Sequence, residues 1–104
     1  MHYKVVFTPE AEEQLAELYR YIAISASPKR AADFTNALID YCESLEKFPL
    51  RGNTRDDIRP GLRITGYRRR VVIAFDVAAD SVNIIGIFYG GQDYEAALEE
   101  DDPN

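Results

Sequence analysis

Two dipeptides, Thr8-Pro9 and Ser27-Pro28, predict that the first half of the chain forms a pair of helices. A Ser or Thr oxygen caps the free N–H groups at a helix start, and proline is favoured at the first helical position. Apolar residues at helical spacing follow each start: Ala11, Leu15, Leu18 and Ile22 in the first, then Phe34, Leu38, Tyr41, Leu45 and Phe48 in the second. The second helix should end near Phe48, because Pro49 follows. The break between the two patterns is so short that the helices must fold back as a hairpin.

Short β-rich runs flank this hairpin in the sequence, one before it at residues 3–7 and three after it. The later runs, at residues 62–67, 70–77 and 82–89, are separated by tight turns, which favours an antiparallel meander. Residues 50–61 are rich in turn formers and charge, and they predict a loop. The expected fold is α+β in the order β-α-α-β-β-β, with the helix hairpin packed on a small, mainly antiparallel sheet. The first strand would pair at an edge or enter the sheet by a long return.

The length of 104 residues predicts a single domain, at residues 1–92, followed by an acidic C-terminal tail at residues 93–104. From Asp93 onward there are six acidic residues and no Lys or Arg. We expect a solvated, frayed end that aids solubility, with a short helical turn at residues 92–99. The sharper alternative is that the tail screens the chain's arginines or repels nucleic acid.

Several classes of protein are disfavoured. No apolar run is long enough to span a membrane, and the N-terminus shows no secretory signal, so a cytoplasmic location is expected. Cys42 is the only cysteine, which suits a reducing compartment. There is no phosphate-binding loop, dinucleotide fingerprint or metal cluster, and the one histidine is His2, so we expect no cofactor and no metal. The carboxylates Asp56 and Asp57 lie beside arginines and favour a solvated turn over an acid/base couple.

Arginine is concentrated in one stretch of the chain, residues 51–70. Seven of the twelve cationic residues fall within it: Arg51, Arg55, Arg59, Arg63, Arg68, Arg69 and Arg70. Because the whole chain has a formal net charge of −6, these arginines predict a local positive surface. Guanidinium groups pair with phosphate or carboxylate in two-point contacts, so the surface would bind an RNA backbone or an acidic protein segment that folds on binding. The alternative is structural, with individual arginines satisfying helix acids such as Glu43 and Glu46.

Turn and helix positions add three expectations. Arg68, Arg69 and Arg70 fall at a hairpin turn, where strand alternation would send their side chains to different faces. Tyr41 lies on the apolar stripe of its helix and should belong to the core. Tyr19 and Tyr21 flank the stripe of the first helix, and exposed tyrosines there would suit a protein interface.

The order of these segments resembles the ParE branch of the RelE/ParE toxin superfamily. The resemblance rests on FTPEAEEQL, a helix hairpin ending in FP, a loop glycine, PGLR, YRRRVVIAF and IIGIFYGGQDYE, and it covers roughly residues 3–95. It implies a bacterial toxin of a type II toxin-antitoxin pair. The partner would be a ParD-like antitoxin whose disordered C-terminal part folds along the toxin, giving a hetero-oligomer that reaches operator DNA only through the antitoxin. ParE-branch toxins inhibit DNA gyrase, whereas the RelE branch cleaves messenger RNA at the ribosome.

Two residues at the end of the chain's last predicted strand and just after it favour the ParE branch over the RelE branch. Tyr89 stands where many relatives have histidine, and Gln92 where they often have arginine, which leaves Tyr89 and Asp93 as the only candidates for proton transfer. A tyrosine with an ordinary pKa of about 10 is a poor base. The leading hypothesis is therefore a non-catalytic gyrase inhibitor, neutralised by its antitoxin. Its predicted binding residues are Tyr19, Tyr21, Arg59, Arg63, Arg69, Tyr89, Gln92 and Asp93.

Two alternatives remain open. A RelE-like, ribosome-dependent endoribonuclease would use Arg63, Arg69, Arg70 and Tyr89 on RNA. A pure interaction module without toxicity is also compatible with the sequence. In the leading hypothesis the antitoxin segment lies across the helix hairpin and the arginine-bearing sheet.

Overall fold

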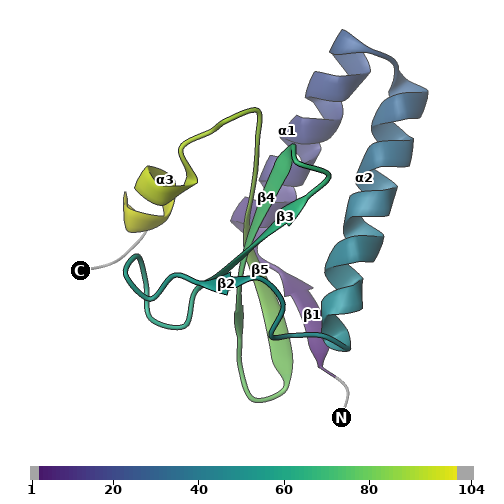
Figure 1. The fold of residues 1–104 in the computed structure, drawn as a ribbon. Helices are drawn as coiled ribbons and strands as arrows, with labels where there is room; N and C mark the ends of the chain where they lie inside the picture. The colour runs from purple at the N-terminus through teal and green to yellow at the C-terminus, as the bar shows by residue number, and fades with distance from the viewer. Residues whose placement is uncertain (1–2, 101–104) are drawn as a thin grey trace.

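A computed structural model describes residues 3–100 and shows a five-stranded mixed sheet with helices on both faces (Figure 1). The strand order is β1-β5-β4-β3-β2. Strand β1 (Lys4–Phe7) lies at an edge, parallel to β5 (Ser81–Tyr89), and the other pairs are antiparallel. The remaining strands are β4 (Val71–Val77), β3 (Arg63–Tyr67) and β2 (Asn53–Thr54). The α+β class and the meander of β3, β4 and β5 are confirmed, and of the two placements of the first strand the edge is observed.

Strand β2 corrects the prediction of an unbroken loop over residues 50–61. Asn53 pairs with Ile64 and Thr54 with Arg63, so two residues of the predicted loop extend the sheet. Both residues are exposed, so no alternating apolar pattern marks them in the sequence. The pairing follows from the sharp turn at Gly52, whose φ of +81° brings the chain alongside β3.

The helix starts agree with the two Ser/Thr-Pro signals. Helix α1 (Pro9–Ser25) begins where Thr8 Oγ1 accepts a hydrogen bond from the Ala11 N–H at 3.2 Å. Helix α2 (Pro28–Glu43) begins where Ser27 Oγ accepts one from the Arg30 N–H at 3.1 Å. These bonds satisfy N–H groups that would otherwise lack a partner at the helix start.

The predicted end of the second helix near Phe48 is wrong. Helix α2 ends at Glu43 and is followed by a short 3₁₀ helix, η1 (Ser44–Glu46). The Ser44 hydroxyl donates to the Tyr41 carbonyl, and this competes with regular helical bonding. Leu45 is fully buried, but Phe48 is 57% exposed and does not extend the apolar stripe.

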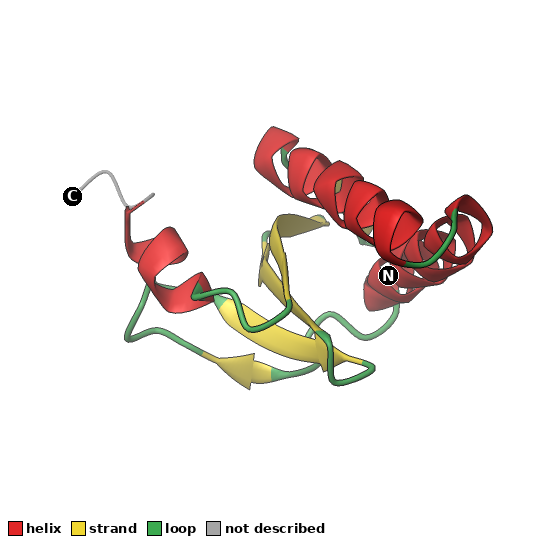
Figure 2. Ribbon diagram, turned by 90° about the horizontal axis from the view of Figure 1, so that it is seen from above, coloured by secondary structure: helices red, strands yellow, loops and turns green. Residues whose placement is uncertain are grey.

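The two faces of the sheet carry separate apolar clusters. Helices α1 and α2 cover one face, where Leu18, Leu38 and Leu45 pack with sheet residues such as Phe75. Figure 2, seen from above, shows the helix hairpin on one side of the sheet and helix α3 (Tyr94–Glu100) on the other. Tyr41 packs against the first cluster, and its hydroxyl lies 3.2 Å from Thr65 Oγ1, as expected for a core tyrosine.

Helix α3 corrects the expectation of a solvated end, while the short helical turn expected there is present. Leu98 is only 1% exposed and packs with Ile58, Leu62, Ala74 and Phe88 in the second cluster. Glu95 and Glu99 therefore lie on a helix that packs on the sheet through Leu98, because removing that side chain from water is favourable. The tail positions Asp101 and Asp102 lie outside the described residues.

We expect the thiol of Cys42 to be inert in the native protein. Its side chain is fully buried, and burial together with nearby Glu43 raises its pKa to about 12. Because the thiolate is the reactive form, iodoacetamide at pH 8 should leave native Cys42 unmodified and alkylate it fully in denaturant. Mass spectrometry of both samples measures this, and rapid alkylation of the native protein would contradict the burial.

The described residues contain neither a membrane-spanning helix nor a group of metal ligands. No helix among them is both long and apolar enough to cross a membrane. Nor does any group of three or more His, Cys, Asp or Glu side chains between residues 3 and 99 lie in a position to hold a metal ion.

Candidate binding cleft

A cleft of about 490 Å³ opens where both helices of the hairpin meet the end of the sheet. Its walls come from α1, the beginning of α2, the turn between β3 and β4, and the end of β5. The lining residues are Leu18, Tyr21, Ile22, Ala26, Arg30, Phe34, Arg69, Arg70, Val71, Tyr89, Gly90 and Gly91. They combine an apolar floor, two tyrosines and three arginines.

The floor and one wall of the cleft are apolar or aromatic. Leu18 and Val71 are almost fully buried and belong to the main core cluster. The rings of Tyr21 and Tyr89 pack together at a centroid distance of 5.5 Å and an angle of 39°. Tyr21 remains 58% exposed, so part of its ring is available to a ligand.

The cations of the cleft are Arg30, Arg69 and Arg70, which are exposed. Within residues 3–99, ion pairs join Lys29 to Asp33, and Arg55 to Asp57 and Glu95, and none of these involves the three cleft arginines. The described lining contains no carboxylate. The cleft is therefore locally positive in a chain whose formal net charge is −6.

The turn that carries two of these cations has a left-handed backbone. Arg68 and Arg69 have φ angles of 51° and 60°, and the Arg70 N–H donates to the Tyr67 carbonyl at 3.2 Å. This is the geometry of a type I′ hairpin turn, which favours Asn and Gly. The expectation that strand alternation orients Arg68 to Arg70 is wrong, because these residues belong to the turn and not to a strand. The Arg68 guanidinium lies over Tyr67 and Phe34, 5.1 and 5.9 Å from their ring centroids.

Replacing the turn with Arg68→Asn and Arg69→Gly should raise the free energy of unfolding by about 1–2 kcal/mol. Left-handed backbone is costly for arginine and nearly free for glycine. Loss of the Arg68 contacts with the two rings offsets part of the gain. Urea denaturation measures the change, and a loss of stability would show that the arginine contacts outweigh the backbone strain.

The other arginines of the stretch contact their own chain. Arg51 lies over the rings of Tyr41 and Phe48, at 5.3 and 5.2 Å from the centroids. Arg59 donates to the Leu98 carbonyl at 2.9 Å and so fastens α3 to the preceding loop. Arg63 donates to the carbonyls of Leu50 and Arg51 and holds the loop that leads into β2.

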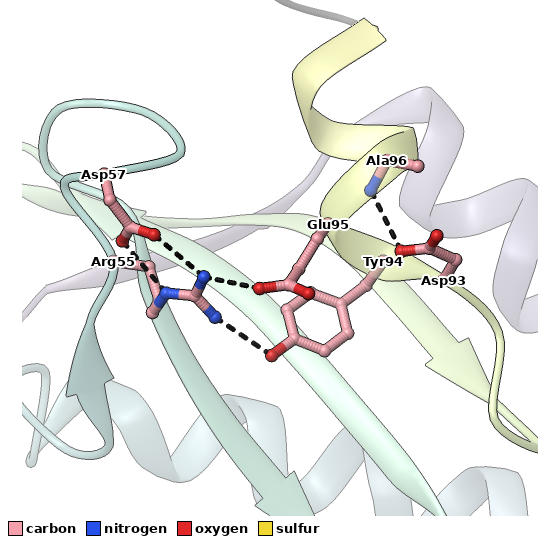
Figure 3. Close-up of polar contacts among 6 residues, drawn as sticks. All are labelled: Arg55, Asp57, Asp93, Tyr94, Glu95 and Ala96. Atoms are coloured by element: carbon pink, nitrogen blue, oxygen red, sulfur yellow. Dashed lines mark hydrogen bonds and ion pairs between the residues drawn. The ribbon is translucent and has the colours of Figure 1, made fainter.

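Arg55 forms the most extensive polar cluster, shown in Figure 3. Its guanidinium pairs with Asp57 at 2.9 Å, with Glu95, and with the Tyr94 hydroxyl at 3.2 Å. The hydrogen bonds from Arg55 lower the pKa of the Asp57 carboxyl below its ordinary value. Asp93 lies next to this cluster, and its carboxylate accepts from the Ala96 N–H at 3.1 Å as the cap of α3.

Comparison with known proteins shows which family has this architecture. The family model for the ParE toxin of the type II toxin-antitoxin system parDE matches residues 5–94. The chain belongs to the ParE toxin family. The match confirms the resemblance carried by the sequence motifs. No curated protein matches the chain.

Solved structures share the ParE fold. A chain of the chromosomal ParDE toxin-antitoxin system from P. aeruginosa superposes with a TM-score of 0.74 at 19% identity, covering 85% of this chain and 96% of that one. A chain of the toxin-antitoxin complex RelBE2 from Mycobacterium tuberculosis gives a TM-score of 0.61 at 20% identity, covering 86% of this chain and all of that one. At such low identity these likenesses concern the fold.

The ParE fold brings together only part of the predicted site. Tyr21, Arg69, Arg70 and Tyr89 line one cleft. Of the seven arginines at residues 51–70, Arg69 and Arg70 line this cleft, while Arg59 and Arg63 donate to backbone carbonyls. The suggested pairing with Glu43 and Glu46 is also not observed among the described side chains.

The remaining predicted residues lie elsewhere in the ParE fold. Tyr19 lines a separate shallow groove with Leu15 and Ile39, between the two helices. Gln92 Oε1 accepts a hydrogen bond from the Tyr89 N–H at 3.0 Å, next to the cleft. Arg30 was not predicted as a site residue, because the only sequence signal near it is the helix start. It reaches the cleft because the fold brings the beginning of α2 to the end of the sheet.

Proposed function

We propose that this chain is a ParE-type toxin that inhibits bacterial DNA gyrase by binding it, in the cytoplasm, and that a cognate ParD-like antitoxin neutralises it. The observation that carries the proposal is the match of the ParE toxin family to residues 5–94. The antitoxin would form a hetero-oligomer with the chain and connect it to operator DNA. The solved neighbours described above come from toxin-antitoxin systems, which supports a protein partner.

The chemistry of the cleft supports binding over catalysis. Its three guanidinium groups can hold an anion, but its described side chains offer only tyrosine hydroxyls for proton transfer. Phenols have an ordinary pKa of about 10 and are weak bases near neutral pH. Asp93, the other proton-transfer candidate, is occupied as the cap of α3.

A RelE-like endoribonuclease is the second candidate function. It is favoured by one observation: three of its four predicted residues, Arg69, Arg70 and Tyr89, line the same cleft. The fourth, Arg63, is engaged with loop carbonyls. A nuclease would need charge stabilisation and proton transfer at one phosphate, so Tyr89 would have to supply the proton.

Induced expression without antitoxin separates the two functions. If the chain inhibits gyrase, uptake of labelled thymidine should stop within the first minutes while uptake of labelled methionine continues. A nuclease acting at the ribosome would reverse this order. If both continue while soluble protein accumulates, the proposed toxicity is refuted.

The variant Tyr89→Phe should keep the toxicity of the parent chain within about two-fold if the toxin acts by binding. The substitution removes a hydroxyl but keeps the ring beside Tyr21. If the chain is a nuclease, the loss of its proton donor should lower the rate by about 10²–10⁴-fold. Growth arrest after graded induction, at matched protein levels, measures the difference.

A further inference from the structure

We infer that the turn at residues 48–51, named the apolar turn, is the surface through which the toxin contacts DNA gyrase. In this arrangement the side chains of Phe48 and Leu50 enter an apolar pocket of the enzyme. The inference rests on the proposed function, because it takes gyrase as the target, and it adds the residues that make the contact. The apolar turn follows the end of α2 and the cleft lies at its beginning, so the two surfaces are at opposite ends of that helix (Figure 1).

Two neighbouring hydrophobic side chains of the apolar turn are exposed to water. Phe48 is 57% exposed and Leu50 is 70% exposed, and together with Pro49 and Arg51 they line an open hollow. A single exposed hydrophobic side chain is ordinary, whereas a gathered group marks a contact site. The other exposed large hydrophobics among residues 3–99 lie on β1 and α1: Val6, Tyr19, Tyr21 and Ile24.

The apolar turn is held in shape by its own residues. The Arg51 N–H donates to the Phe48 carbonyl at 3.3 Å, which closes a four-residue β-turn. Pro49 occupies the second position of this turn, where the fixed φ of proline is favoured. The Arg51 guanidinium lies 5.2 Å from the centroid of the Phe48 ring and supports that ring from one side.

Strand β3 holds the apolar turn from the other side. Arg63 donates to the carbonyls of Leu50 and Arg51. Immediately after the turn, Gly52 has a φ of +81° and Asn53 begins the pairing with β3. An exposed leucine adds little to the stability of the fold, because its side chain remains in water. The fold therefore fixes the position of Leu50 without itself gaining from that side chain.

A rigid, exposed pair of this kind suits a folded protein partner. In protein interfaces, a few large side chains that enter pockets of the partner carry most of the binding energy. Because the backbone of Phe48 and Leu50 is already ordered, binding would cost little additional conformational entropy. A folded enzyme can offer a preformed pocket, and a flexible segment cannot. The apolar turn therefore complements a folded target such as gyrase.

The charges at the apolar turn favour a pocket with an acidic rim. Lys47 is exposed, and the guanidinium groups of Arg51 and Arg63 lie at the turn. Glu46 is the one carboxylate among residues 46–52, so the cations are in excess. Complementary charge selects an acidic rim, and like charges disfavour the contact of one apolar turn with that of a second copy.

Binding to purified DNA gyrase tests the inference. Surface plasmon resonance on the immobilised full chain gives the Kd, and plasmid supercoiling gives the toxin concentration for half inhibition. Phe48→Ala combined with Leu50→Ala should raise both values by about 30-fold or more, because the side chains that enter the pocket are removed. Pro49→Gly keeps both side chains but frees the turn, and it should raise both values by about three-fold.

The matched control is Val6→Ala combined with Ile24→Ala. It truncates two other exposed hydrophobic side chains, outside both the apolar turn and the cleft lining, and should change both values by less than about two-fold. Circular dichroism verifies that each variant is folded, and sedimentation velocity gives its oligomeric state.

Failure of the inference and failure of the proposed function give different results. If the parent chain inhibits gyrase and the Phe48/Leu50 variant inhibits it equally, the inference fails and the proposed function stands. If the parent chain neither binds gyrase at about 1 μM nor inhibits it, both fail. Equal losses in the variant and in the matched control would also overturn the inference. A parent chain that dimerises, with the dimer lost in the Phe48/Leu50 variant, would assign the apolar turn to a second copy and overturn it.

Discussion

Leu98→Ala should free helix α3 from the sheet and lower the free energy of unfolding by about 3 kcal/mol. Among residues 94–99 of α3, Leu98 is the buried one, at 1% exposure, and it packs with Ile58, Leu62 and Phe88. Truncation removes its apolar contacts and leaves a cavity at the sheet surface. Amide hydrogen exchange should show faster exchange throughout α3, and urea denaturation should give the loss in stability.

The control for this change is Leu50→Ala. It deletes the same atoms from a leucine that is 70% exposed, so its effect should stay within about 0.5 kcal/mol. If the two variants lose equal stability, the packing of α3 on the sheet contributes nothing measurable. If Leu98→Ala unfolds the protein completely, α3 belongs to the cooperative core and is not a peripheral helix.

Gly52→Ala should destabilise the chain by about 3 kcal/mol or more. Its φ of +81° is unfavourable for any residue with a Cβ, which costs about 1–2 kcal/mol. The added Cβ would lie only 3.0 Å from the Ile64 carbonyl carbon and from Thr65 Cβ, and still closer to the Ile64 oxygen. Backbone at this position cannot yield without disturbing the pairing of β2 with β3.

Gly61→Ala separates the two causes of that loss. Gly61 has nearly the same φ, +80°, but no atom lies within 4 Å of the place that an added Cβ would occupy, so only the backbone cost of about 1–2 kcal/mol should appear. Thermal unfolding of both variants gives the difference. Equal losses would show that the contact with β3 relaxes freely and that conformational strain alone requires glycine at position 52.

The regular elements could be predicted where local chemistry decides them. Thr8 and Ser27 cap their helices in the expected way, and the β-rich runs after residue 61 form three consecutive antiparallel strands. Prediction failed where a distant segment decides the outcome. Strand β2 exists because β3 lies beside it, and α3 is held by a sheet surface that precedes it in the chain.

Prediction of the candidate site likewise succeeded for some residues and failed for others. Tyr21, Arg69, Arg70 and Tyr89 were predicted, and the fold places all of them at one cleft. Arg59 and Arg63 were predicted for the same reason, their charge, yet they donate to carbonyls of α3 and of the loop before β2. Residue type alone does not distinguish an arginine that meets a ligand from one that satisfies the backbone of its own chain.

The sequence by itself determined the helix starts, the meander of the three later strands, the family and the local excess of arginine. Each of these depends on capping, periodicity, motif order or composition, which can be read along the chain without knowing which distant residues come into contact. Only the tertiary structure decided which arginines remain available to a ligand. Arg30 joins Arg69 and Arg70 because the helix hairpin folds against the end of the sheet, and Arg55 is committed to Glu95 because α3 returns across the opposite face. These contacts join residues far apart in the chain, and their geometry follows from packing, which local pattern does not specify.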